Sequence, residues 1–493
     1  MKFNLSLLLL LLGTIEQVCI AQSPGAFTPT GHLTTPRQHH TATLLTTGQV
    51  LIAGGQMNLP SGDAASSAEL YDPVAGTFTA AGNMVSARYG HTATMLPTGQ
   101  VLIVGGSSGA SERALATAEL YDAISGRFIQ TGSMATGRVF HTATLLTTGK
   151  VLITGGYDGK IWAASAELYD PSTGGFTRTG DMTTGRSEHS ATLLTNGTVL
   201  IEGEDQNGDV SDDVYDPGAG IFAPTGGGTE PAGYGYSSAA ALLTSGKVLL
   251  TLMFEAAYCD QAKLYDPTAG AFSATANMSL ARYYGQTATV LPDGKVLVVG
   301  THDYDQDHAT ADLYDPGAGT FHITGEADPG REWHTATLLP DGTVLLTGGV
   351  HFVQDSSSDM GFGMATLDSA VIYHPAISTS SPVLFSLTVD ASGQGVVWHT
   401  ATGQLASRDN PAVAGEVLAT YTTNLIDGAA IPPQVAVGGW LSEILFFGSA
   451  PGYPGVSQVN FRMPAETAQG PAVPVRLTYL GRPSNEVTIG VRQ

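Results

Sequence analysis

Cysteine is almost missing from this sequence, which contains only Cys19 and Cys259. Cys19 lies in an apolar leader that export would remove, so the mature chain would keep one cysteine and no internal disulfide. Its stability would then come from packing and hydrogen bonding. Apolar stretches long enough to cross a bilayer are missing as well, because the leader's run from Leu5 to Leu12 is too short for a membrane anchor.

Basic residues are scarce: 20 Lys and Arg stand against 43 Asp and Glu, which gives a net charge of −23. Nucleic acids and anionic membranes attract basic surfaces, so neither is an expected partner. The sequence also has no phosphate-binding Gly loop with Lys, no Ser-His-Asp motif and no Cys/His zinc spacing. These absences argue against the enzyme classes that motifs reveal directly, but not against a site assembled from separate repeats.

The first 21 residues have the pattern of a secretory signal peptide. Lys2 precedes the apolar run, and Ala21 with Cys19 two residues earlier forms a plausible cleavage site. We therefore predict a signal peptide at 1–21 and a secreted protein, either extracellular or periplasmic.

Glycine is abundant, at 62 residues, and it punctuates a phrase that returns seven times. Each copy has an approach loop, His-Thr-Ala-Thr-Leu-Leu or a variant, a Gly turn, Val-Leu-Ile-x-Gly-Gly, and later Glu-Leu-Tyr-Asp-Pro. The copies recur every 48 to 51 residues and begin at His40, His91, His141, His189, Ser238, Gln286 and His334. One such unit cannot bury its own apolar face, so a period near 50 predicts the stacked blades of a β-propeller.

Each copy divides into four expected strands, of which the last reads Gly-x-Phe-x-x-Thr-Gly. The seventh copy lacks that last strand, while an orphan version stands at 25–31. We therefore predict an all-β fold in which residues 25–31 complete blade 7 and close a seven-bladed propeller over 22–376. An Arg before the first strand, a diglycine after the second and a Tyr in the third make the repeats similar to kelch repeats.

The period stops after the seventh copy. Residues 377–493 are predicted to form a linker and a C-terminal β-sandwich of immunoglobulin type, because short apolar strands such as 433–437 alternate with Pro/Gly turns. Segments 410–416, 458–461 and 484–488 resemble a C-terminal domain that recurs in exported proteins of soil bacteria. That resemblance implies a β-sandwich with no chemistry of its own.

The binding site is expected on the face where loop lengths vary, because loops on a rigid scaffold carry function. Blades 4 to 6 depart most from the repeat, and aromatic and acidic residues gather there, a combination that suits a sugar or another polar ligand. We predict a carbohydrate or protein ligand near blades 4–7, bound by Glu202, Glu204, Tyr234, Tyr236, Tyr258, Tyr283, Tyr284, His302, Asp303, Asp305, Trp333 and His334. Ordinary drift in blades whose packing tolerates it is the alternative interpretation.

The repeated His residues occupy one position in five blades, so we expect them to form hydrogen bonds within or between blades. Two acidic loops, at 205–209 and 303–307, space their oxygen ligands as calcium loops do, but neither has Gly at the sixth position. We expect solvated turns there. No metal or other cofactor is therefore predicted.

A seven-bladed kelch propeller followed by an immunoglobulin-like domain resembles the galactose oxidase and glyoxal oxidase family of copper radical enzymes. The segment 331–334 is similar to that family's Arg-x-Tyr-His, which places His334 on a copper-ligand histidine. The family's axial tyrosine falls on Trp333 and its cross-linked tyrosine on Gly90. Its cysteine partner has no counterpart, and His399 lies well before the loop that would hold the second copper histidine. Copper needs converging nitrogen and oxygen ligands, so the resemblance implies an incomplete site.

The sequence therefore predicts a secreted, non-catalytic binding or interaction module. The alternative is a carbohydrate- or aldehyde-directed enzyme on a galactose-oxidase-like scaffold. In that case Glu202, Glu204 or Asp303 would serve in a carboxylate site built across blades. The identity of the ligand and the oligomeric state stay open.

Overall fold

The protein is described here by a computed structural model. The described residues are 25–57, 62–109, 114–225, 236–253, 259–282, 285–300, 309–354, 362–375, 383–387, 394–423, 425, 433–450, 456–465, 467–479 and 482–492. The regular structure of these residues consists of strands, which confirms the predicted all-β class. In this part of the chain no helix has the length and apolarity to cross a membrane. The leader at 1–21 lies outside the described residues.

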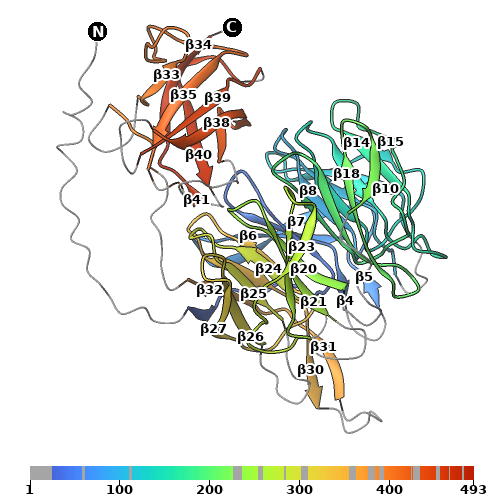
Figure 1. Cartoon of the computed structure of the whole chain (residues 1–493). Helices are drawn as coiled ribbons and strands as arrows, with labels where there is room; N and C mark the ends of the chain where they lie inside the picture. The colour runs from blue at the N-terminus through green and yellow to red at the C-terminus, as the bar shows by residue number, and fades with distance from the viewer. Residues whose placement is uncertain are drawn as a thin grey trace.

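Seven four-stranded antiparallel sheets, called blades 1 to 7 below, follow one another along the chain (Figure 1). Blade 1 contains β2 (Thr41–Leu44), β3 (Val50–Ala53), β6 (Ser67–Asp72) and β7 (Thr77–Asn83). Blade 2 contains β8 (Thr92–Met95), β9 (Val101–Val104), β10 (Thr117–Asp122) and β11 (Arg127–Ser133). Blade 3 contains β12 (Thr142–Leu145), β13 (Val151–Thr154), β14 (Ala166–Asp170) and β15 (Gly175–Arg178).

The remaining blades repeat this order of strands. Blade 4 contains β16 (Ser190–Leu193), β17 (Val199–Glu204), β18 (Val210–Asp216) and β19 (Ile221–Pro224). Blade 5 contains β20 (Tyr236–Leu242), β21 (Val248–Met253), β22 (Ala262–Asp266) and β23 (Ala271–Ala274). Blade 6 contains β24 (Thr287–Val290), β25 (Val296–Val299), β26 (Ala309–Asp315) and β27 (Thr320–Ala327). Blade 7 contains β28 (Thr335–Leu338), β29 (Val344–Thr347), β32 (Ala370–His374) and β1 (Ala26–Pro29).

Two contacts close the sheets into a ring. The first strands of neighbouring blades pack against one another in sequence, and β28 of blade 7 packs against β2 of blade 1. The predicted closing strand is confirmed, because β1 pairs antiparallel with β32, with Phe27 opposite Tyr373. The outer edge of blade 7 is therefore covered by the other end of the propeller chain, as it must be if the ring is to have no open sheet edge.

The second strand is buried throughout in blades 1, 2, 3, 6 and 7, because both of its faces pack against neighbouring blades. Buried ion pairs lie beside these strands in five blades. In each, the Arg that precedes the first strand reaches an acid in the third, over distances of 2.6 to 3.4 Å. The pairs are Arg37–Glu69, Arg88–Glu119, Arg138–Glu167, Arg186–Asp213 and Arg282–Asp312.

The repeated His residues join neighbouring blades, which confirms their predicted structural role. In each case the imidazole Nε2 lies 3.0 to 3.1 Å from a Thr hydroxyl of the preceding blade. Burial lowers the pKa of all five, and nearby Arg guanidinium groups lower it further. For His141, His189 and His334 the pKa is about 3. These imidazoles are therefore neutral in the folded protein near pH 7.

We expect the free energy of unfolding to fall steeply as the pH drops below about 6.5. The unfolded chain then takes up protons on histidines that the folded chain keeps neutral, so it binds more protons and is favoured. Each such histidine contributes up to about 1.4 kcal/mol per pH unit. Denaturant unfolding between pH 7 and pH 5 measures the slope. His141→Gln, which copies Gln286 of blade 6, should reduce it, and the exposed His322→Asn should not; equal slopes in all three proteins would contradict the assignment.

Two further sheets form the C-terminal unit, drawn in orange to red in Figure 1. The first contains β33 (Val397–His399), β35 (Val417–Thr422), β39 (Ser457–Arg462) and β38 (Glu443–Ser449). The second contains β34 (Ala412–Val413), β42 (Val487–Arg492), β40 (Gly470–Tyr479), β36 (Gln434–Val437), β37 (Trp440–Leu441) and β41 (Arg482–Pro483). Apolar residues of both sheets share one core, which includes Phe461 and Ile489.

Two short hairpins complete the described strands. They are β4 (Gln56–Met57) with β5 (Asp63–Ala64), and β30 (Val350–Gln354) with β31 (Phe362–Thr366). The propeller-like fold predicted from the repeat is thus present. The kelch type of the repeats, the immunoglobulin type of the C-terminal sheets and the domain limits 22–376 and 377–493 stay predictions.

Candidate functional site

In six of the seven blades, the residue directly before the repeated His or its replacement has a left-handed backbone. We call these residues the channel ring; their φ angles run from 49° to 67°, and they are His39, Gly90, Phe140, Glu188, Gly285 and Trp333. The counterpart in blade 5, Ser237, lies in β20, and its side chain is outside the described part. A positive φ is uncommon for residues other than Gly and often marks a functional position.

Hydrogen bonds between main-chain groups hold the channel ring in place. The N–H of His39 donates to the carbonyl of Trp333 over 3.3 Å, and the N–H of Gly90 donates to the carbonyl of His39 over 3.0 Å. The series continues from Phe140 to Gly90 and from Glu188 to Phe140, over 2.9 and 3.0 Å. Each bond crosses from one blade to the blade before it, so this backbone belt links five consecutive blades, from 7 through 1 to 4.

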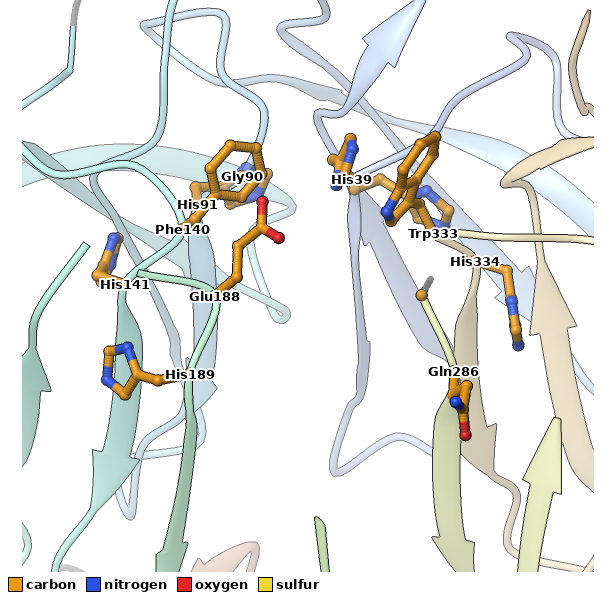
Figure 2. Close-up of a pocket in the computed structure, with 12 residues that line it drawn as sticks. His39, Gly90, His91, Phe140, His141, Glu188, His189, Gln286, Trp333 and His334 are labelled. Atoms are coloured by element: carbon orange, nitrogen blue, oxygen red, sulfur yellow. The ribbon is translucent and has the colours of Figure 1, made fainter. Parts of the chain in front are cut away.

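The ring surrounds a pocket of about 290 Å³. Behind the ring residues, the pocket is lined by the buried side chains that follow them in sequence, including His334 and Gln286. Figure 2 shows the Glu188 carboxylate reaching into the space across from His39 and Trp333. This volume is near the lower limit of about 300 Å³ for small-molecule sites, so the pocket suits a small ligand.

Aromatic side chains form one wall of the pocket. The imidazole of His39 lies between two larger rings, with centroids 5.0 Å from Trp333 and 5.2 Å from Phe140. The two ring glycines make room for these side chains. A Cβ at Gly90 would lie 2.8 Å from the Phe140 ring, and one at Gly285 would lie 2.9 Å from the Trp333 indole. The wall therefore needs Gly at both positions.

Glu188 and His39 are the two titratable members of the ring. The side chain of Glu188 reaches water in the pocket, but surrounding protein raises its pKa by desolvation. Burial among aromatic rings lowers the pKa of His39 to about 4. Among the described residues, neither carboxyl nor imidazole has a hydrogen-bond partner, and no Lys or Arg lines the pocket. Two titratable groups thus line one pocket whose described residues include no Lys or Arg.

The structure places the predicted ligand-binding residues in different surroundings. Trp333 lies in the channel ring, whereas His334 is buried behind it with its Nε2 3.0 Å from the Thr287 hydroxyl. Glu202 has no exposed surface, and its carboxylate pairs with Lys263 Nζ over 3.1 Å. Glu204 ends β17 and is partly exposed. Of these four, Trp333 and His334 line this pocket, Trp333 in the ring and His334 behind it.

The other predicted site residues lie wholly or partly outside the description. They are Tyr234, Tyr258, Tyr283, Tyr284, His302, Asp303 and Asp305, together with the side chain of Tyr236. The acidic loop at 303–307 lies there too. Its counterpart at 205–209 is described, and Asp205 accepts hydrogen bonds from the backbone of Asn207 and Asp209. That loop is the exposed, internally bonded turn that the sequence predicts.

Copper is the metal that the oxidase resemblance implies, and the residues brought together here do not fit it. His334 points its Nε2 at a Thr hydroxyl, Trp333 has no oxygen ligand, and Gly90 has no side chain. His399 lies in the C-terminal unit, where its two nitrogens contact the Glu416 carboxylate and the Asn410 carbonyl. No group of three or more metal-binding side chains occurs among the residues described. Copper prefers such converging ligands, so no chemistry is assigned to it here.

Five members of the channel ring were missed by the sequence analysis, namely His39, Gly90, Phe140, Glu188 and Gly285. A signal for them exists in the repeat itself. The residue just before each repeated His or its replacement differs in almost every blade, whereas the His itself recurs in five of the seven blades. Variation directly before a nearly constant His, at the start of the first strand of each blade, is the signal that could have pointed to these positions.

Comparisons with known proteins bear on the fold. No protein-family model matches the chain, and no curated protein matches it. Among solved structures it is similar to one described as a novel fungal alcohol oxidase with catalytic diversity among the AA5 family, in complex with copper. The two share 18% identity at a TM-score of 0.60, over 96% of this chain and 100% of the other.

This likeness extends over nearly the whole chain and contradicts the prediction of a non-catalytic binding module. The matched scaffold is that of an alcohol oxidase, so the enzyme alternative agrees better with it than the binding module does. At this level of identity the comparison establishes shared architecture and leaves the chemistry to the pocket. The chain therefore has an all-β, propeller-like fold similar to that of this AA5 alcohol oxidase.

Proposed function

We propose that this protein is an enzyme that acts on carbohydrates or small hydroxy-aldehydes by general acid–base catalysis in the channel-ring pocket. The observation that carries the proposal is the pair Glu188 and His39. Both face one pocket of about 290 Å³ without a described hydrogen-bond partner. Unpaired titratable groups with shifted pKa values in a concave site are typical of catalytic acids and bases.

The surroundings of the pair favour a neutral sugar over other small molecules. The wall of Trp333, His39 and Phe140 offers ring faces on which the apolar face of a sugar stacks. The Glu188 carboxyl can accept or donate a hydrogen bond to a hydroxyl group. No Lys or Arg among the described pocket residues would neutralise a carboxylate or phosphate on the ligand. Uronic acids and sugar phosphates are therefore poorer candidates than neutral aldoses.

The pKa shifts of the two groups have opposite directions. Desolvation raises the pKa of Glu188, so its carboxyl is more often protonated near neutral pH than an ordinary glutamic acid. Burial lowers the pKa of His39 to about 4, so its imidazole is neutral and can accept a proton. Environments that push two neighbouring pKa values apart assign one group as the acid and the other as the base. Glu188 is the proposed acid and His39 the proposed base.

The proposal includes the cellular setting that the sequence indicates. The leader at 1–21 supports export, the repeats support the kelch type, and the C-terminal sheets support an immunoglobulin-like domain. An exported enzyme would meet free sugars outside the cytoplasm.

The proposed function is tested on the full-length mature protein after treatment with a chelator. Neutral aldoses and glycolaldehyde are added, and ¹H NMR follows any change in the sugar while a peroxidase-coupled assay follows peroxide. We expect conversion without peroxide, and addition of copper should not increase it. Copper retained near one equivalent together with peroxide release would overturn the proposal in favour of an oxidase. No conversion of any aldose or aldehyde would overturn it altogether.

A further inference from the structure

We propose that the channel-ring pocket opens and closes the ring of a cyclic hemiacetal, and so interconverts the two anomers of a neutral aldose through its open-chain aldehyde. This inference rests on the proposed function and names its reaction. The geometry behind it is one carboxyl and one imidazole that line the same small pocket, which has an aromatic wall (Figure 2). Hemiacetal opening needs one proton donor, one proton acceptor and no further reactant.

Other reactions of sugars require catalytic groups that are missing from the described residues of the pocket lining. Hydrolysis of a glycosidic bond uses two carboxyl groups on either side of the bond, about 5–10 Å apart. Glu188 is the only carboxylic acid among the described residues that line the pocket. Glu332, two residues before His334, has a buried side chain and does not line the pocket. The lining therefore suits a reaction that needs a single acid and a single base.

The step balances with these two groups alone. An imidazole nitrogen of His39 takes the proton of the anomeric hydroxyl, and C1=O forms as the bond between C1 and the ring oxygen breaks. The Glu188 carboxyl gives its proton to that ring oxygen, which becomes a hydroxyl group. Rotation about C1–C2 then presents the other face of the aldehyde. The same transfers in reverse close the ring and return both protons, so the enzyme ends as it began.

The low basicity of His39 separates this reaction from aldose–ketose isomerisation. A base whose pKa is about 4 accepts a proton from an oxygen when an acid assists at the same time. It is a poor base for a proton on carbon, which is far less acidic than a hydroxyl group.

The test uses chelator-treated mature protein and freshly dissolved α-D-glucose and α-D-galactose near pH 6. Polarimetry measures the approach to anomeric equilibrium above the buffer rate, and exchange ¹H NMR in D₂O measures exchange between the two anomeric signals. We expect accelerated exchange with no deuterium entering at C2. Glu188→Gln and His39→Asn should each lower the enzymatic rate at least about tenfold, since general acid–base groups contribute about 10²–10⁴-fold. Asn is chosen because it tolerates the left-handed backbone of residue 39.

The possible outcomes distinguish a failure of this inference from a failure of the proposed function. Deuterium at C2, a ketose product or cleavage of the sugar would overturn the inference and leave an aldose-directed enzyme in place. Conversion of no aldose or aldehyde would overturn both. An anomer exchange rate that survives both substitutions would show that the protein acts elsewhere, and the assignment of this pocket would fail. The exposed His374→Asn serves as the matched control and should behave as the wild type.

Discussion

Replacing Glu188 with Gln is expected to lower kcat/KM by about 10²–10⁴-fold for the sugar that the wild type converts fastest. Gln keeps the size of the side chain but can neither lose nor gain a proton in this pH range. The wild-type rate should rise above about pH 4 as His39 becomes neutral and fall at higher pH as Glu188 ionises. Glu188→Gln should remove the upper limb of this profile and keep the lower one.

The control for this substitution is Glu326→Gln, which removes an exposed carboxyl from β27 of blade 6. It should leave both the rate and the pH profile unchanged. Thermal unfolding of the two variants should match that of the wild type, because neither carboxyl has a described ion pair. A Glu188→Gln protein with normal kcat/KM, or one with a lower rate and an unchanged upper limb, would rule out Glu188 as the acid.

The second large effect concerns stability. Lys263→Met should lower the free energy of unfolding by about 3–5 kcal/mol, since it leaves the carboxylate of Glu202 buried without its cation. Glu202 has no exposed surface, and its oxygen lies 3.1 Å from Lys263 Nζ. The Lys263 ammonium also lies over the Phe272 ring, with Nζ 4.4 Å from the centre of that ring. Denaturant unfolding at pH 7 measures the loss.

The internal repeats suggest the rescue for this defect. Glu202 occupies the strand position that is Thr154 in blade 3 and Thr347 in blade 7. The double variant Lys263→Met with Glu202→Thr therefore removes both charges and should regain most of the lost stability. Lys247→Met breaks a half-exposed pair with Asp266 and should cost far less than Lys263→Met, because solvent screens exposed ion pairs. If the double variant is no more stable than Lys263→Met, the loss comes from packing and not from the stranded charge.

Much of the architecture was predictable because the repeat carries it. The constant His, Arg and Tyr positions all form the same contacts in successive blades, so each copy of the phrase predicts the others. The strand at 25–31 was recognisable because it repeats a pattern that the seventh copy lacks, and β1 pairs with β32 as expected. Such regularities are visible in one sequence because the blades act as their own alignment.

The site was harder to predict, and Glu202 shows why. Glu202 differs from the residue that other repeats have at its position, and this difference suggested a ligand. Instead, Glu202 pairs with Lys263 of the next blade. In that blade Lys263 replaces the usual acid, and Gly235 replaces the usual Arg. Two irregular blades can thus compensate each other inside the core. In the channel ring the variation is only partly compensated, since Gly90 and Gly285 make room for Phe140 and Trp333 while Glu188 has no such counterpart among the described residues. Sequence order alone does not show that positions about 50 residues apart meet around one channel.

In the channel ring, main-chain atoms form the supporting hydrogen bonds of the backbone belt, and side chains line the pocket. Its hydrogen bonds join main-chain atoms, so they would persist whichever amino acid occupies each position, provided that it accepts a left-handed φ. A ring built this way can present different side chains from one backbone, as His39, Glu188 and Trp333 show, but neighbouring positions are coupled where a Gly makes room for an aromatic side chain. Such a design favours the exchange of one catalytic repertoire for another during evolution. It also offers the protein engineer a small combinatorial library, with one residue per blade to vary and the rest of the molecule left untouched.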